Sequence, residues 1–429
     1  MPGLSRAVLK EKLIVTGKGL LVLLKWVVIG IITGLIVGAI SSAFSFCLSY
    51  VTNFRTTHPY IIYGLPIGGL LIVGMYKLVL GKEDEGTDGI ITAISEKPHV
   101  RAMIAPLIFL GTIITHLFGG SAGREGAALQ LGGSLGNFFG RIFRLDEKHR
   151  KVLITTGMSA AFSAIFGTPM AAAIFSVEAA MVGSIYLSSL LPSVIAAVVA
   201  SQFSASLGIS PESFEIRNIP DFSAINGLKI ILLGILVGGL SIVFCAVMKY
   251  SKKYLGKLIK NPFLRVIVVS VVFIGITFLI GGTDFYGAGI DVIERAVHEG
   301  KARPYSFVVK MILTALILGA GFKGGEIVPS FYVGATFGCL FGQILGLSPS
   351  LCAAMGMTAM FCGVTNCPIT SMLISFELFG FNCVPYIIVV AAVSFVASGY
   401  SGIYSSQKFL YSKYRPIYKN KNGGPKDGE

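Results

Sequence analysis

Residues 119–126 read Gly-Gly-Ser-Ala-Gly-Arg-Glu-Gly and place two charged side chains among glycines between apolar stretches. Residues 319–329, Gly-Ala-Gly-Phe-Lys-Gly-Gly-Glu-Ile-Val-Pro, have the same character, and 201 positions separate Glu125 from Glu326. An apolar, helix-like pattern begins after each glutamate. Irregular backbone at membrane depth is tolerated only where it lines a cavity. These two stretches therefore predict broken membrane helices around a polar site.

The composition supports a membrane protein. Of the 429 residues, 54% are apolar and 13% are charged, and 53 are glycine. Soluble domains carry about a quarter charged residues, so a pair of soluble domains, a disordered chain and a disulfide scaffold are all excluded. We expect an all-α polytopic membrane protein.

Long apolar stretches account for most of the chain. A helix of about 20 residues crosses a hydrocarbon core, and several of the stretches exceed 25 residues, so they must contain two helices or a broken one. We expect ten to a dozen crossings and no cleaved signal peptide, because no Ala-x-Ala site follows the first span. The stretches are 26–50, 60–79, 103–118, 153–201, 227–248, 266–281, 307–321 and 349–404.

The net charge of +14 is concentrated in four segments, which hold 22 basic and 5 acidic residues: 1–25, 141–151, 249–265 and 407–429. Basic residues beside short membrane segments mark the cytoplasmic side. We therefore expect both termini in the cytoplasm and the protein in the cell membrane, with the lipid bilayer as its surroundings. Nucleic-acid binding is the alternative, but no groove-reading motif or aromatic platform accompanies the charges.

Cysteine and histidine patterns indicate no bound metal or cofactor. The seven cysteines are odd in number, lie inside apolar stretches and form no Cys-x-x-Cys pair. The five histidines are scattered, and none forms a pair with the spacing of helical metal ligands. We predict neither disulfides nor a metal site.

The chain repeats itself weakly. Residues 169–178 and 368–377 both follow the pattern Pro-x₆-Ser-x-Glu, 199 positions apart, and Gly86 begins a motif that returns at Gly287 after 201 positions. Two homologous halves are typical of transporters built from repeats; the alternative is that glycine-rich membrane helices simply look alike. We expect a basic segment 1–25, repeats at 26–226 and 227–404 with a basic loop 249–265, and a short basic tail 405–429.

The helix N-termini expected in the glycine clusters are suited to binding an anion. A helix N-terminus presents unpaired N–H groups and about half a positive charge. Several such ends, contributed by both halves, predict an anion site near the membrane midplane. No Gly-Lys-Ser/Thr follows the glycines, so no phosphate-binding P-loop is expected.

Glu125 stands out because a carboxylate at such a helix start competes with an anion for the same amides. Protonation would neutralise it and release it, which couples proton movement to anion movement. The alternative is local pairing with Arg124. Glu326 has the same two interpretations, with Lys323 as its possible partner. The duplicated Glu178 and Glu377 favour a shared structural role, such as a bond to a neighbouring helix end.

These residues resemble the CLC chloride channels and chloride/proton antiporters. Gly-Arg-Glu-Gly is similar to the second signature of that family. Residues 86–90, Gly-Thr-Asp-Gly-Ile, resemble the first signature, and residues 325–329, Gly-Glu-Ile-Val-Pro, resemble the third. Gly-Ile-Tyr at 402–404 resembles the late segment whose tyrosine closes the inner end of the anion path.

The resemblance implies a homodimer in which each subunit has its own anion pathway between two inverted helical repeats with broken, re-entrant helices. Glu125 takes the position of the gating, proton-coupling glutamate, with Glu326 assisting. Thr87 takes the place of the inner serine and Tyr404 that of the inner tyrosine. The residues expected around the anion are Thr87, Gly123, Arg124, Glu125, Gly126, Gly325, Glu326, Ile327 and Tyr404.

Departures from the family pattern point to a branch. Ala179 stands where chloride/proton antiporters carry an internal glutamate, and the acid Glu326 occupies a variable position of the third signature. Both features resemble the bacterial fluoride/proton antiporters. No cytoplasmic nucleotide-sensing (CBS) domain is expected after Tyr404. The resemblance implies fluoride export in exchange for protons; the alternatives are a chloride/proton antiporter or chloride channel. A membrane enzyme is disfavoured because no nucleophile–base pair is evident.

Overall fold

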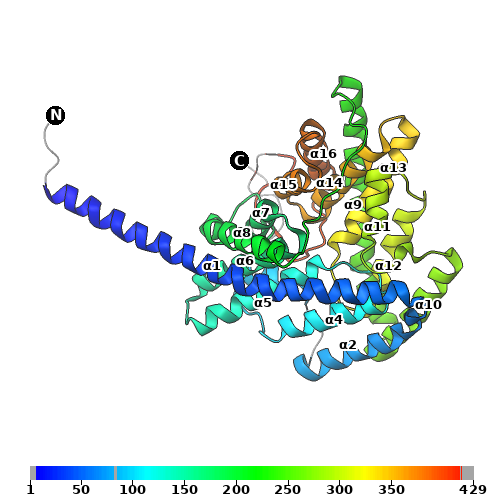
Figure 1. Cartoon of the computed structure of the whole chain (residues 1–429), viewed down its shortest axis with the longest axis horizontal. Coiled ribbons are helices and arrows are strands. Elements are labelled where there is room, and N and C mark those ends of the chain that lie inside the picture. Colours follow the sequence, from blue (N-terminus) through cyan, green and yellow to red (C-terminus); the bar gives the residue numbers. More distant parts are fainter. Residues whose placement is uncertain (1–5, 82–84, 416, 418–429) are drawn as a thin grey trace.

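A computed structural model describes residues 6–81, 85–415 and 417, with side chains from residue 19 onward. Helices dominate it (Figure 1). The first half contains α1 (Arg6–Thr57), η1 (Pro59–Gly64), α2 (Leu65–Leu80), α3 (Thr87–Ser95), α4 (Ile104–Leu117), α5 (Glu125–Ile142), α6 (Glu147–Phe166), α7 (Pro169–Glu178), β1 (Met181–Val182), η2 (Leu187–Ser189) and α8 (Leu190–Ser206).

The second half repeats this order. It contains α9 (Ala224–Leu258), α10 (Pro262–Ile280), η3 (Thr283–Phe285), α11 (Ile290–Glu294), η4 (Arg295–Glu299), α12 (Ser306–Ala320), α13 (Ile327–Leu345), α14 (Pro349–Thr365), α15 (Pro368–Phe379), α16 (Val384–Ala397) and β2 (Lys408–Phe409). Among the described residues, each half contains eight α-helices, and in this order α5 and α7, which carry the repeated motifs, match α13 and α15.

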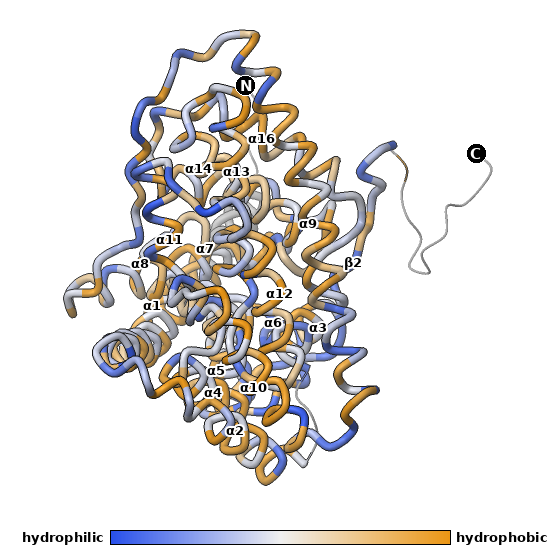
Figure 2. The backbone as a smooth tube through the Cα atoms, turned by 90° about the vertical axis from the view of Figure 1, so that its right-hand side faces the viewer, coloured by the Kyte–Doolittle hydropathy of each residue, from blue (hydrophilic) through white to orange (hydrophobic). Residues whose placement is uncertain are grey.

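Only some of the helices are long enough to cross a bilayer. Among the described residues, six helices combine the length and hydropathy of a membrane span, and six further apolar helices have 10–17 residues. The predicted stretch 153–201 divides into α6, α7 and α8, and the stretch 349–404 contains α14, α15 and α16. The expected broken helices are therefore present. Figure 2 shows hydrophobic residues along most of the helical body.

The segment 249–265 is not the loop that its charge predicted. Helix α9 continues to Leu258, and α10 begins at Pro262. The Asn261 side chain accepts a hydrogen bond from the N–H of Phe263 at 3.0 Å, which caps α10. The basic side chains thus lie mostly on two helix ends. The expected repeat boundaries at 25/26 and 226/227 also fall inside helices, in α1 and α9.

Glycine pairs bring the central helices into backbone contact. A Cβ added at Gly132 of α5 would lie 2.1 Å from the carbonyl oxygen of Gly157 in α6. In the other half, a Cβ at Gly334 of α13 would lie 2.4 Å from the carbonyl oxygen of Gly356 in α14. Any larger residue would force these helices apart. The two buried pairs α5/α6 and α13/α14 therefore form a compact support for the helix starts of α5 and α13.

Two glutamates link the halves reciprocally. The Glu178 carboxylate accepts hydrogen bonds from the N–H groups of Ile369 and Thr370, at 3.2 and 2.9 Å, at the start of α15. The Glu377 carboxylate accepts from the N–H groups of Met170 and Ala171, at 2.8 and 2.9 Å, at the start of α7. The predicted structural role of these acids is confirmed. The start of each of these two helices is filled by a carboxylate from the other half.

Candidate functional site

The starts of α5 and α13 meet through the glycines that precede them. The N–H of Gly123 donates to the carbonyl of Gly325 at 2.8 Å, and the N–H of Gly325 donates back to the carbonyl of Gly123 at 2.8 Å. The two segments form an isolated antiparallel bridge. The predicted convergence of helix starts from both halves is therefore present, because two N-termini lie side by side in the centre of the molecule.

Glycine is required at this meeting point. A Cβ on Gly325 would lie 2.4 Å from the backbone nitrogen of Gly126 and 3.0 Å from its Cα. Real Cβ atoms do not approach backbone so closely, so an alanine would separate the two segments. The glycines of this motif therefore allow one helix start to touch the other.

The Glu125 side chain folds back over its own helix start. Glu125 is buried, and its Oε2 accepts a hydrogen bond from the N–H of Arg124 at 2.9 Å. A carboxylate thus accepts from an amide at a helix start, a position that suits negatively charged groups. The Nε of Arg124 lies 3.4 Å from Glu125 Oε1, so the alternative of local pairing is also met. The guanidinium of Arg124 donates a hydrogen bond to Glu212 as well.

A cavity of about 550 Å³ adjoins Arg124 on one side of the bridge. We call it the Arg55 cavity, because the buried Arg55 and His116 line it together with Asp284 and Asp291. Arg55 donates a hydrogen bond to the His116 carbonyl at 2.5 Å. The His116 Nδ1 lies 3.0 Å from the carbonyl of Thr112, so Nδ1 carries the proton of that bond. This cavity brings the cations Arg55 and Arg124 together beside the start of α5.

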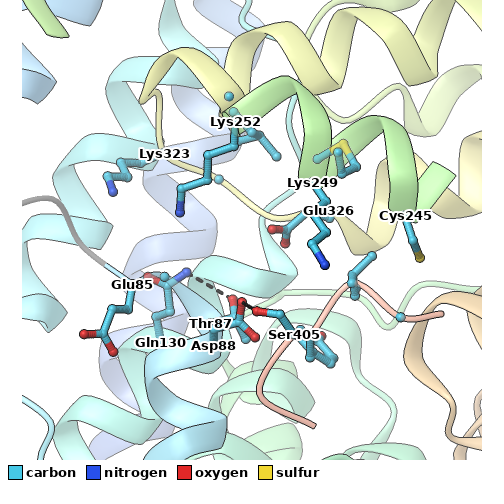
Figure 3. Close-up of a pocket in the computed structure, with 18 of the residues that line it drawn as sticks. Glu85, Thr87, Asp88, Gln130, Cys245, Lys249, Lys252, Lys323, Glu326 and Ser405 are labelled. Atoms are coloured by element: carbon cyan, nitrogen blue, oxygen red, sulfur yellow. Dashed lines mark hydrogen bonds between the residues drawn. The ribbon is translucent and has the colours of Figure 1, made fainter. Parts of the chain in front are cut away.

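A second cavity, of about 350 Å³, contains the other glutamate, Glu326, and is called the Glu326 cavity (Figure 3). Thr87, at the start of α3, and Tyr404 line it together with Glu326. A Cβ built on Gly126 would lie 3.2 Å from Glu326 Oε2, so this carboxylate reaches the first turn of α5. Each of the two bridged helix starts therefore has one glutamate close by.

Thr87 and Tyr404 offer hydroxyls near this helix start. The Thr87 hydroxyl donates to the carbonyl of Gly126 at 3.4 Å and accepts from Gln130 Nε2 at 3.2 Å. Tyr404 is 5% exposed, and its hydroxyl has no hydrogen-bond partner within the described chain. A buried hydroxyl without a partner is costly. The Tyr404 hydroxyl is therefore available as a donor inside the Glu326 cavity.

Seven of the nine residues expected around the anion lie at the two helix starts, and the other two, Thr87 and Tyr404, line the Glu326 cavity. Gly123 and Gly325 form the bridge, Arg124 and Glu326 are the N-cap residues of α5 and α13, and Ile327 is buried at the first position of α13. Their roles toward an anion stay predictions.

Sequence reasoning missed several residues of the Glu326 cavity. Gln130, five positions after Glu125, lines it, and its polarity inside an apolar helix was an available signal. Lys249, Lys252 and Lys253 of α9 also line it, beside Lys323, which the sequence already suggests as a partner of Glu326. Figure 3 shows Lys252 and Lys323 on the opposite side of the cavity from Asp88. The sequence pattern of the basic segment indicates only the orientation in the membrane. Its first three lysines also add positive charge to the cavity.

Asp88 anchors the C-terminal segment 404–413, here called the tail, which begins with Tyr404. Its carboxylate accepts hydrogen bonds from the hydroxyl of Ser405 at 2.8 Å and from the N–H of Ser406 at 3.1 Å. Farther along, Lys413 donates to Asn366 Oδ1 at 2.5 Å and to the carbonyl of Phe395 at 2.9 Å. Hydrogen bonds therefore hold the tail both near Ser405 and near Lys413.

We expect Asp88→Ala to loosen this tail without unfolding the protein. Each lost hydrogen bond to a carboxylate is worth about 1.5–3 kcal/mol before solvent screening. Protease cleavage after Lys408 should therefore be faster in the variant than in the wild type, measured by mass spectrometry of a timed digest. Glu299→Gln, which removes an exposed acid paired with Lys301 far from the cleavage site in the sequence, is the control. Equal cleavage rates in the Asp88 variant and the wild type would refute the anchoring role.

The sequence also matches a known family. A sequence model described as voltage gated chloride channel, the CLC family, matches residues 68–399. The chain belongs to the CLC family. The fold prediction is thereby confirmed: this is an all-α, polytopic membrane protein with the CLC architecture of inverted helical repeats, from a family of transporters and channels.

Relatives within the CLC family include a channel protein and an exchange transporter. A protein from Pseudomonas syringae pv. tomato, described as a chloride/fluoride channel protein, is 33% identical over 374 residues, covering 85% of this chain and 82% of the relative. An H(+)/Cl(−) exchange transporter from Vibrio campbellii is 25% identical over 337 residues, covering 72% of this chain and 70% of the relative.

Solved CLC structures superpose closely. The crystal structure of a CLC-type fluoride/proton antiporter gives a TM-score of 0.87 at 30% identity and covers 90% of this chain and 98% of the other. A slow cyanobacterial Cl⁻/H⁺ antiporter gives a TM-score of 0.75 at 19% identity, covering 87% of this chain and 94% of the other. The second likeness shows the fold alone.

Proposed function

We propose that this CLC protein is a fluoride/proton antiporter that exports fluoride from the cytoplasm. The observation that carries the proposal is the position of Glu125, whose carboxylate occupies the Arg124 amide where the helix starts of both halves meet. The similarity to a CLC-type fluoride/proton antiporter over 90% of the chain supports the choice of ion.

The proposed cycle uses Glu125 as the gate. When Glu125 is ionised, it holds the amide at the start of α5 and excludes the anion. Protonation removes its charge and weakens the hydrogen bond to Arg124, so the side chain leaves and fluoride takes its place. The Arg55 cavity, which adjoins Arg124, is the proposed route by which protons from outside reach Glu125.

Glu326 is proposed to act from the other cavity. Its carboxylate lies close to Gly126 and in the same cavity as Tyr404. A small anion entering there meets the Tyr404 hydroxyl and the start of α5 as donors. Glu326 is proposed to exchange a proton with the cavity and so to assist coupling. Ala179 has no side chain that could carry a proton, so the internal glutamate of chloride/proton antiporters has no equivalent at that position.

The proposal includes an orientation in the membrane and a homodimeric assembly. We place the Glu326 cavity on the cytoplasmic side, because Lys249, Lys252 and Lys253 of the basic segment line it. Both termini are then cytoplasmic, in the cell membrane, and two copies form a homodimer with a separate pathway in each. Cross-linking in vesicles that yields only monomer would contradict the dimer.

Parallel anion efflux from proteoliposomes tests the choice of ion. We expect vesicles loaded with both anions to release fluoride faster than chloride, measured with ion-selective electrodes. Fluoride running down its gradient should also drive protons inward against a pH gradient, measured with a pH-sensitive dye inside the vesicles. Chloride release as fast as fluoride release would assign the protein to the chloride-transporting members instead. Fluoride flux without proton movement would make it a channel.

A further inference from the structure

The backbone around Tyr404 has little regular structure of its own. Helix α16 ends at Ala397 and β2 begins at Lys408, and the chain between them forms turns and bends. One backbone hydrogen bond, from the N–H of Ile403 to the carbonyl of Val364 at 2.9 Å, reaches α14. The position of Tyr404 therefore depends mostly on contacts with other segments.

Asn366, at the end of α14, contacts the chain on both sides of Tyr404. Its Nδ2 donates to the carbonyl of Ser401 at 3.0 Å and to Oε1 of Gln407 at 3.0 Å. These acceptors lie three positions before and three positions after Tyr404. The Oδ1 of Asn366 accepts from Lys413 at 2.5 Å. Asn366 is 1% exposed, and because both its amide nitrogen and its amide oxygen have partners, the orientation of the amide is fixed.

Gln407 extends this contact to a second helix. Its Nε2 donates to the carbonyl of Thr365 at 2.9 Å and to the carbonyl of Ala179, the C-cap residue of α7, at 2.9 Å. Gln407 is also buried, so two buried amides have all their donors satisfied. A buried polar network in which every member is satisfied is rigid. The segment around Tyr404 is thereby held against a helix of each half.

The local sequence fits this contact at two positions. Asn366 has a φ of 58°, in the left-handed region that asparagine adopts more readily than most residues. Gly402 lies directly against its side chain, since a Cβ at Gly402 would lie 2.7 Å from Asn366 Nδ2. The hydrogen bonds of that amide leave it no room to move away. Glycine at 402 is therefore what lets Asn366 reach the Ser401 carbonyl.

We propose that Asn366 is a positioning residue of the anion pathway, which keeps the Tyr404 hydroxyl in the Glu326 cavity. Tyr404 lines that cavity together with Glu326, whereas Asn366 is not among the described residues that line it. Asn366 therefore acts through Tyr404 and does not contact an anion in the cavity. The effect on transport rests on the proposed function, but the placement of Tyr404 does not.

Fluorine NMR of the purified, full-length protein tests the placement of Tyr404 directly. A fluorinated tyrosine is incorporated at position 404 alone. We expect one narrow signal from the wild type. Asn366→Gly, which removes the side chain and adopts the left-handed backbone without strain, should broaden or split that signal. The nearly isosteric Asn366→Asp should do the same, because a carboxylate cannot donate to Ser401 or Gln407.

Asn218→Gly is the matched control. Asn218 also has a positive φ, of 56°, but it is exposed and is not among the described residues that line the Glu326 cavity. This variant should keep the narrow signal. An unchanged signal in both Asn366 variants, or the same broadening in the Asn218 variant, would overturn the proposal.

A double-mutant cycle tests the effect on transport. Fluoride and chloride efflux are measured in parallel for the wild type, Asn366→Gly, Tyr404→Phe and the double variant. We expect each single substitution to slow efflux several-fold. The double variant should be no slower than Tyr404→Phe, because the position of a hydroxyl that has been removed no longer matters.

Two results would show that Asn366 does not act on transport through Tyr404. One is a double variant in which the two losses multiply, and the other is efflux at the wild-type rate from Tyr404→Phe. Chloride release as fast as fluoride release by the wild type would reject only the choice of ion, since the comparison among the variants holds for either anion. The NMR result is independent of transport altogether.

Discussion

Glu125→Gln should abolish proton transport in reconstituted vesicles while the protein stays folded. The amide keeps an oxygen that can accept the hydrogen bond from Arg124, so the side chain still fits at the start of α5. It cannot bind and release a proton, so anion movement can no longer drive proton movement. The measurement is proton uptake driven by a fluoride gradient, together with the fluoride efflux rate.

A surface glutamate provides the control for this variant. Glu147 is also the first residue of a helix, α6, but it is exposed. Glu147→Gln should leave fluoride efflux and proton uptake at the wild-type level. If the Glu125→Gln protein still moves protons uphill, Glu125 is not the coupling residue.

Glu326→Gln should strongly reduce fluoride transport with little loss of stability. Its carboxylate reaches the first turn of α5, where an anion would bind, and it shares a cavity with Tyr404. A neutral amide removes both the negative charge and the capacity to exchange a proton at this point. We would measure the efflux rate in vesicles and, separately, the thermal melting of the detergent-solubilised protein.

The two measurements distinguish a transport role from a structural one. An acid at the N-cap of α13 contributes to the helix through its dipole, an effect typically worth about 0.3–1 kcal/mol. Loss of melting temperature in proportion to the loss of transport would indicate that structural role. Normal transport would show that Glu326 is only a helix-end acid.

Local sequence patterns predicted the parts of this molecule that depend on local chemistry. A glutamate within a glycine cluster, followed by an apolar pattern, predicted helix starts just after Glu125 and Glu326, and the helices begin at Glu125 and Ile327. The repeated Pro-x₆-Ser-x-Glu pattern predicted that Glu178 and Glu377 share one role. The apolar stretches predicted membrane helices, and their length predicted that they would be broken.

The sequence patterns could not predict contacts between segments that lie far apart in the chain. Nothing near Gly123 indicates that it hydrogen-bonds to Gly325, and nothing near Arg124 points to Glu212. The lysines of segment 249–265 looked like surface charges, since their number was visible but the direction of α9 was not. On a helix such as α9, a shift of one or two positions in the sequence changes whether a lysine side chain points toward water or toward a cavity.

The pairing of β1 with β2 has a consequence for biosynthesis. Val182 of the first half is paired with Phe409, almost at the end of the chain. At a synthesis rate of about 5–20 residues per second, the ribosome adds Phe409 roughly 10–45 s after Val182. Tyr404, close to β2, can take its place only in that last interval. A growing chain therefore inserts most of its helices before β1 can pair with β2, so premature termination near residue 400 would leave a membrane protein that lacks both β2 and Tyr404.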